Sequence, residues 1–315
     1  MSKLEANPFG KDGWTPESLD SQKGKTYLIT GGNAGIGFEA TKLLASKGAK
    51  VIILSRNEKK VNAAIEEIKQ FYPNADIEFT KLNLASLESV RSAAKNINSS
   101  IEKIDALICD AAIAQIATQK FTTDGLESQL GVNYYGNFLL SALLFDKIDK
   151  SHGRIVYVSS LGYKMGHKRI QFEDMNFDKN YHPNNVYSHS KLALMLFAYE
   201  LQRRVKKTNK NMQIQVCHPG SSKTTLIKED APFLTRMLLK LIFPFFQSAQ
   251  KGSWPEVLCA TEDELEDETF YGATKRGETV GPIGKSTLHS FALDEEVAKK
   301  LWSVSEEKIG FTWKI

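Results

Sequence analysis

The chain has 315 residues, of which 42% are hydrophobic and 25% charged, a composition typical of a globular protein with a sizeable core. Its net charge of +4 comes from 41 basic and 37 acidic residues spread along the chain without dense basic blocks, which argues against nucleic acid as a partner. Its three cysteines, Cys109, Cys217 and Cys259, are odd in number and widely spaced, a pattern that indicates buried thiols and neither a disulfide framework nor a metal site.

The first residues, 1–22, are polar and are interrupted by prolines and glycines. They contain neither the apolar centre of a signal peptide nor a membrane span, which needs about 20 apolar residues. We therefore expect a loosely held tail over 1–22, one domain over 23–315, and a cytoplasmic location in which the thiols stay reduced.

Short apolar runs alternate with helical patterns along the rest of the chain. Strands that are buried on both faces of a parallel sheet have this continuous apolar character. The sequence predicts strands over 27–30, 51–54, 77–81, 106–109, 155–158, 213–218 and 269–271. It predicts helices over 38–46, 59–71, 86–101, 126–148, 186–206, 248–261 (interrupted by Pro255) and 294–308. This order predicts a single-domain α/β fold, with a doubly wound parallel sheet of the Rossmann type and helices on both faces.

The first predicted strand ends in a glycine-rich turn, Thr30-Gly-Gly-Asn-Ala-Gly-Ile-Gly37. Where side chains are absent, the amides that begin the next helix can face a pyrophosphate, and the helix dipole favours an anion there. The turn is therefore a candidate dinucleotide site, although a tight strand-to-helix connection alone can also require glycine. Its candidate residues are Gly31, Asn33, Gly35, Ile36 and Gly37.

The residues after the second predicted strand are Ser55, Arg56 and Asn57. They lie about 20 residues beyond the glycines, where the adenosine ribose binds in dinucleotide sites. A carboxylate at this place favours NAD, whereas a neutral serine followed by a planar cation suits a 2′-phosphate. The sequence therefore predicts NADP(H) as the cofactor. The alternative is that Arg56 is a solvated surface charge.

Tyr187 and Lys191 are four residues apart in a predicted helix, so they share one face. A phenol titrates near about pH 10, and a neighbouring ammonium favours the phenolate, which makes the pair a candidate general acid/base. Ser160 follows the strand over 155–158 at the sheet edge where ligands bind, and there it can hold a carbonyl oxygen or merely cap a turn. Asn133 belongs either to the same site or to a helix whose neighbourhood it satisfies.

These motifs, in this order, resemble those of the short-chain dehydrogenases/reductases, and the resemblance covers about 24–310. The stretches 54–57, 172–176, 190–193 and 301–302 are similar to the retinol dehydrogenase-like branch. The resemblance implies that Tyr187 is the general acid/base and that Ser160 orients the carbonyl. It implies that Lys191 binds the nicotinamide ribose and lowers the phenol pKa, and that Asn133 anchors a proton-relay water. The residues that it assigns to the nicotinamide end are Pro219, Gly220 and Thr224.

Two positions depart from the family pattern. The chain has Cys109-Asp-Ala-Ala112 where the family usually has Asn-Asn-Ala-Gly, and it has Asn83-Leu84 where an Asp-Leu pair normally receives the adenine. The catalytic set is intact. We therefore expect the departures to affect adenine contacts and local turn geometry.

Two segments, 161–184 and 221–247, interrupt the alternation after strands at the edge where Ser160 lies. In the second, apolar side chains far outnumber charges. We interpret 221–247 as an apolar lid over a hydrophobic aldehyde, ketone or alcohol. A helix packed on the core and a peripheral membrane anchor are the alternatives. The apolar run 192–197 either faces the sheet or forms a homodimer interface.

The sequence thus predicts an NADP(H)-dependent oxidoreductase that moves a hydride between the cofactor and a small apolar carbonyl or alcohol, with Tyr187 passing the proton. A rival from another class is a catalytically silent NADP-binding sensor or scaffold protein, because a fold does not fix a function. A nucleotide-sugar epimerase or dehydratase is disfavoured, since the chain after Lys191 is short for a separate sugar-nucleotide domain.

Overall fold

The computed structural model describes residues 7–222 and 246–315, in which eight strands form one sheet in the order β3-β2-β1-β4-β5-β6-β7-β8. The strands are β1 (Thr26–Thr30), β2 (Lys50–Ser55), β3 (Asp76–Lys81), β4 (Ala106–Cys109), β5 (Arg154–Val158), β6 (Gln213–Cys217), β7 (Phe270–Lys275) and β8 (Val280–Ser286). All neighbours from β3 to β7 pair in parallel, so the predicted doubly wound parallel sheet is confirmed. The strand order reverses between β1 and β4, where ligands bind in folds of this type.

The eighth strand was not predicted. β8 contains Gly281, Pro282 and Gly284, residue types that are depleted in strands, so its sequence lacks the usual apolar signal. It pairs antiparallel with β7 at the edge of the sheet. An edge tolerates proline because one side of the strand has no ladder to complete.

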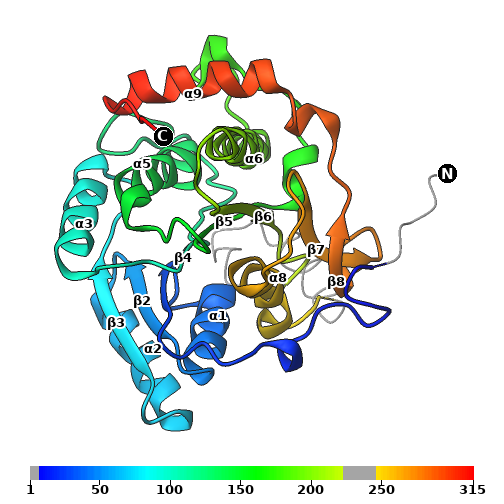
Figure 1. Ribbon diagram of the computed structural model, residues 1–315. Helices are drawn as coiled ribbons and strands as arrows, with labels where there is room; N and C mark the ends of the chain where they lie inside the picture. Colours follow the sequence, from blue (N-terminus) through cyan, green and yellow to red (C-terminus); the bar gives the residue numbers. More distant parts are fainter. Residues whose placement is uncertain (1–6, 223–245) are drawn as a thin grey trace.

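The helices lie in two layers, one on each face of the sheet (Figure 1). The helices of one layer are α1 (Gly35–Ser46), α2 (Glu58–Phe71) and α8 (Ala249–Thr261), and those of the other are α3 (Leu87–Ser100), α5 (Gly136–Leu144) and α6 (Pro183–Lys206), with α9 (Glu295–Ile309) packed on α6. Several N-termini are closed by polar caps, as for Ser86, whose side chain accepts from the amide of Ser89. α8 runs through Pro255, which was expected to interrupt it.

The helix predicted over 126–148 is divided into pieces. A short α4 (Ser128–Leu130) leads into a π-helical turn (Gly131–Tyr135), and α5 and a 3-10 turn (Phe145–Lys147) follow. π-turns are rare and recur at functional sites. Here the turn carries Asn133.

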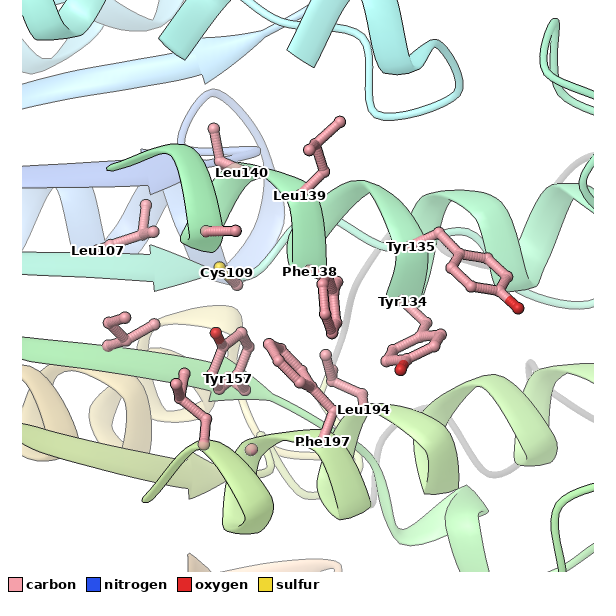
Figure 2. Close-up of a cluster of buried hydrophobic side chains, with 14 of the residues drawn as sticks. Leu107, Cys109, Tyr134, Tyr135, Phe138, Leu139, Leu140, Tyr157, Leu194 and Phe197 are labelled. Atoms are coloured by element: carbon pink, nitrogen blue, oxygen red, sulfur yellow. The ribbon is translucent and has the colours of Figure 1, made fainter. Parts of the chain in front are cut away.

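Aromatic rings fill the space between α5, α6 and the sheet (Figure 2). Phe138 and Phe197 lie with ring centroids 4.7 Å apart, and the Tyr157 ring is 5.3 Å from that of Phe197. Trp302 from α9 and Trp313 from the C-terminal segment also pack against Phe138, at 5.1 and 5.6 Å. The apolar run 192–197 belongs to this core and is buried within the chain.

Residues 7–22 differ from the loosely held tail that the sequence predicts. The Trp14 side chain is only 2% exposed, and its Nε1 donates to Glu262 Oε1 at 2.6 Å. Its backbone forms an isolated antiparallel bridge with Ile283 of β8, and Leu19 is buried as well. The prediction missed this because a single tryptophan among polar residues gives no periodic signal. The predicted lid lies largely outside the described residues.

Within the described part of the chain, no helix combines the length and the apolar character needed to cross a bilayer.

Candidate active site

A cleft of about 580 Å³ opens at the carboxyl ends of the strands, where the strand order reverses. Residues that the sequence places far apart meet in its lining, because the loops after β1, β2 and β3 all reach this edge. The predicted cofactor residues that line it are Gly31, Asn33, Gly35, Ile36, Ser55, Arg56, Asn57, Asn83 and Leu84. Asp110, which follows β4, lies in the same lining.

The glycine turn at the floor of this cleft has the shape of an anion cradle. Gly31 and Gly35 have φ values of +76° and +60°, a conformation that favours glycine. A Cβ at Gly37 would lie 2.6 Å from Asp110 Oδ2 and 2.8 Å from the Gly31 carbonyl oxygen, so the third glycine is needed for close packing. The N-cap of α1 is Ala34, which offers no side-chain acceptor to the first amides. The turn therefore fits a dinucleotide diphosphate.

Basic side chains line the outer part of the cleft. Arg56, which precedes α2, and Lys60, in the first turn of α2, are both exposed there, and Lys120 in the loop after β4 also lines the cleft. Among the described residues, none of these three cations has an ion-pair partner in the structure. Sequence reasoning missed Lys60 and Lys120, although the spacing of Lys60 from Arg56 was a usable signal.

Two other polar side chains after β2 and β3 form hydrogen bonds with nearby backbone amides. The Asn57 side chain caps α2, accepting from the Lys60 amide at 3.0 Å. Asn83, the residue in place of an aspartate, accepts from the Ala85 amide at 3.2 Å through its Oδ1. Leu84 is 7% exposed and presents an apolar surface to the cleft. The loop after β3 therefore keeps a defined shape despite the Asp-to-Asn departure.

Ser160 and Tyr187 meet at the end of β5. Ser160 lies two residues beyond Val158, the last residue of β5, and Tyr187 reaches it from the first turns of α6, where the two side chains interact. The Ser160 Oγ also accepts from the Gly162 amide at 3.0 Å, which fixes its position. A Cβ at Gly162 would lie 3.0 Å from Tyr187 Cε1. The loop thus needs a glycine where it passes the tyrosine ring.

Lys191 is buried one turn further along α6. Its Nζ donates to the Val158 carbonyl at 2.8 Å and lies 6.0 Å from the centre of the Tyr187 ring. Burial lowers the pKa of Lys191 to about 8, and the carboxylate of Asp110 opposes this shift. The main contact of the Lys191 ammonium in the structure is therefore its hydrogen bond to the Val158 carbonyl of β5.

The pKa of Tyr187 is not lowered in the structure. Burial raises it above the ordinary value of a phenol, and the neighbouring Ser160 side chain opposes the rise. Desolvation is the largest influence on this phenol, and the lowering of its pKa by Lys191, whose ammonium lies 6.0 Å from the ring centre, stays a prediction.

Asn133 is held in the π-turn by three hydrogen bonds. Its Oδ1 accepts from the Ile113 amide at 2.8 Å, while its Nδ2 donates to the Ile113 carbonyl at 2.9 Å and to Ser190 Oγ at 3.0 Å. It thereby joins the loop after β4 to α6. The side-chain groups of Asn133 are used in protein contacts, so the geometry supports a positioning role.

The predicted nicotinamide-end residues follow β6, beyond the lining of the cleft. Gly220 has φ +63°, and a Cβ there would lie 2.5 Å from the Thr279 carbonyl oxygen. Gln247 Nε2 donates to the Pro219 carbonyl at 2.5 Å. Thr224 lies outside the described residues.

Comparison with known proteins identifies the family. The family model for short chain dehydrogenase matches residues 25–233, about two thirds of the chain. The chain belongs to the short chain dehydrogenase family. Mouse retinol dehydrogenase 14 is 35% identical over 300 residues, which cover 91% of this chain and 86% of that protein. Mouse retinol dehydrogenase 13 is 34% identical over 293 residues, which cover 91% and 84%.

A solved structure agrees with this assignment. The crystal structure of an uncharacterized protein from Mycobacterium paratuberculosis, 30% identical, matches with a TM-score of 0.78 over 96% of this chain and 100% of that one. The short chain dehydrogenase described here is thus retinol dehydrogenase-like, and its family consists of oxidoreductases that bind a nicotinamide cofactor.

Proposed function

We propose that this short chain dehydrogenase is an NADP(H)-dependent oxidoreductase of apolar aldehydes, ketones or alcohols, with Tyr187 as the general acid/base. The observation that carries the proposal is the position of the Tyr187 phenol beside Ser160, with the buried ammonium of Lys191 on the same helix face. The nicotinamide, when bound, supplies or accepts the hydride. The test is NADPH oxidation with a panel of aldehydes, ketones and quinones; binding without any oxidation would contradict it.

Different residues of the site bind the substrate oxygen, transfer the proton and hold the loops in position. Ser160 is fixed by the Gly162 amide, so its hydroxyl is oriented to hold the substrate oxygen. Tyr187, which lies beside Ser160, gives a proton to that oxygen in reduction and takes it in oxidation. The charge of Lys191 favours the phenolate, an effect that grows as water leaves the site. Asn133 holds the loop after β4 against α6.

The preference for NADP(H) rests on charge at the mouth of the cleft. Arg56 and Lys60 line the same wall, and among the residues described neither has a carboxylate partner that would neutralise it. A 2′-phosphate is a suitable partner for such a pair, since charge-assisted bonds to phosphate are strong. Asn57 brings no competing negative charge.

The apolar substrate is proposed from the predicted lid over 221–247 and from one described feature. Met165 is 81% exposed in the loop that begins at Ser160, so a flexible apolar side chain lies close to the reacting groups in sequence. Exposed methionines suit ligands of variable shape.

For straight-chain aldehydes, we expect kcat/KM to rise about three- to fourfold for each added methylene, because burial of a CH₂ contributes about 0.8 kcal/mol. Steady-state kinetics with a series of increasing length would measure this slope. A flat slope, or a preference for short charged carbonyls, would contradict the apolar site.

The proposal includes a cytoplasmic location. Cys109, Cys217 and Cys259 are buried and free in the structure, as expected in a reducing compartment. Fractionation of cells that express a tagged chain would test it, and recovery with the membrane fraction would contradict it.

A further inference from the structure

Asp110 takes the place of the second asparagine in the family's usual Asn-Asn-Ala-Gly motif, and its surroundings differ from those of a surface carboxylate. It directly follows β4 and lines the cleft together with the glycine turn. Its carboxylate packs against Gly37, the third residue of α1, where an added Cβ would lie 2.6 Å from Asp110 Oδ2. The next residue, Ala111, donates its amide to Thr30 Oγ1 at 3.0 Å, which ties this loop to the end of β1.

This contact places a carboxylate from another part of the chain at the N-terminus of α1. The N-cap residue Ala34 has no side-chain hydrogen bond, and the first turn of α1 contains no acidic residue. An N-terminal amide without an acceptor is costly when it is shielded from water, and a carboxylate is a favourable partner for it. The carboxylate of Asp110 therefore lies beside the helix end that forms the anion cradle.

The groups around Asp110 come from four elements. Lys191 and Tyr187 face it from α6, Glu256 from α8 and Cys217 from β6, while Cys109 precedes it in β4. Of these, Lys191 is its cationic neighbour. Glu256 is 1% exposed, and neither of its carboxyl oxygens has a hydrogen-bond partner in the described structure, so burial raises its pKa well above the ordinary value and it stays protonated.

Asp110 is poised to change its charge near neutral pH. Burial raises its pKa to about 7, while Lys191 and the Gly37 amide oppose that rise. A second negative charge at the same helix end would favour the protonated form of Asp110, because two like charges repel each other strongly in a site shielded from water.

We propose that Asp110 is a positioning residue of the cofactor site, which holds the first turn of α1 as a carboxylate and takes up a proton from solvent when a dinucleotide diphosphate binds at the adjoining amides. The inference rests on the proposed function only in that a nicotinamide dinucleotide binds in this cleft. By linkage, affinity is then highest below the pKa of Asp110 and weakens as pH rises through it.

The experiment is calorimetric titration of the full chain with NADH at about pH 7, in two buffers that differ in ionisation enthalpy. NADH lacks the titratable 2′-phosphate of NADPH, so it reports on the protein. If binding raises the pKa of Asp110 by one unit, the wild type takes up about 0.4 proton per NADH, and its Kd weakens by about tenfold between low and high pH. Lys191 is already largely charged at this pH and contributes little.

Two variants separate Asp110 from its neighbours. Asp110→Asn, which restores the family's usual residue, should abolish the uptake and flatten the pH dependence of Kd. Glu256→Gln is the matched control, because it removes the other buried carboxyl of this region and should leave the uptake unchanged. Infrared difference spectra of the wild type supply a second readout: NADH should increase the band of a protonated carboxyl, even if a variant fails to fold.

Binding of NADH without proton uptake, or equal uptake by Asp110→Asn, would overturn this inference alone. Loss of uptake in Glu256→Gln would overturn it too and would assign the proton to Glu256. If the wild type binds neither NADH nor NADPH, the dinucleotide site itself is refuted and the inference falls with it.

Discussion

Replacing Tyr187 by phenylalanine is expected to lower kcat by about two to four orders of magnitude, the usual contribution of a general acid/base. The substitution removes one hydroxyl and keeps the ring in its place on α6, where it is partly buried. Ser160 remains fixed by the Gly162 amide, so the substrate oxygen can still be held. Steady-state rates with NADPH and a reactive aldehyde measure the loss.

Binding of NADPH should change little in this variant, because the glycine turn and Arg56 are untouched; fluorescence titration would check this. Tyr163→Phe is a matched control: Tyr163 lies three residues after Ser160, but its hydroxyl donates to the Thr287 carbonyl and accepts from the His289 amide. It should keep most of its turnover. Full activity of Tyr187→Phe would remove this residue from the mechanism.

The Arg56→Ala variant is expected to weaken NADPH binding by about 10- to 150-fold while changing NADH binding little, since a charge-assisted contact to phosphate is worth about 1.5–3 kcal/mol. Arg56 is exposed at the mouth of the cleft, so its contribution depends on the bound phosphate and should fall as salt is added. Paired Kd measurements for the two nucleotides, at low and high salt, measure the effect.

Two adjacent lysines shortly after Arg56, Lys59 and Lys60, offer an internal control. Lys60 lines the cofactor cleft, whereas Lys59 lies on another surface of α2 together with Glu58 and Glu66. Lys60→Met should therefore reduce the preference for NADPH, and Lys59→Met should leave it unchanged. Equal losses for NADH and NADPH in Arg56→Ala would contradict the assignment of a 2′-phosphate site.

Much of the fold follows from simple patterns in the sequence. The strand 106–109 was predicted with its bounds, because four apolar residues between turn signals have few other places in an α/β protein. The cap Ser86 was likewise evident from the sequence. β8 could not be predicted, because its sequence contains glycine and proline in place of the usual apolar signal. The bridge of Trp14 to Ile283 could not be predicted either, because it joins segments about 270 residues apart.

The candidate site was predictable where its residues sit on regular elements. The helical spacing of Tyr187 and Lys191 and the glycine turn after β1 are local, so the sequence alone indicated them. The direction of the Tyr187 pKa was not predictable, because it depends on burial that only tertiary packing creates. The contact of Asp110 with Gly37 also depends on tertiary structure. Asp110 follows β4 and Gly37 lies in the helix after β1, and these two strands are neighbours only in the folded sheet.

The position of α9 has a consequence for how the chain reaches its native state. Trp302 and Trp313 close the aromatic core around Phe138, yet they are made more than 160 residues after it. A nascent chain emerges from its N-terminus, so Phe138 and Phe197 leave the ribosome before the two tryptophans that pack against them. Contacts of such long range also slow folding, because a large loop must close before they form. Completion of this core therefore waits for the last twenty or so residues to be synthesised.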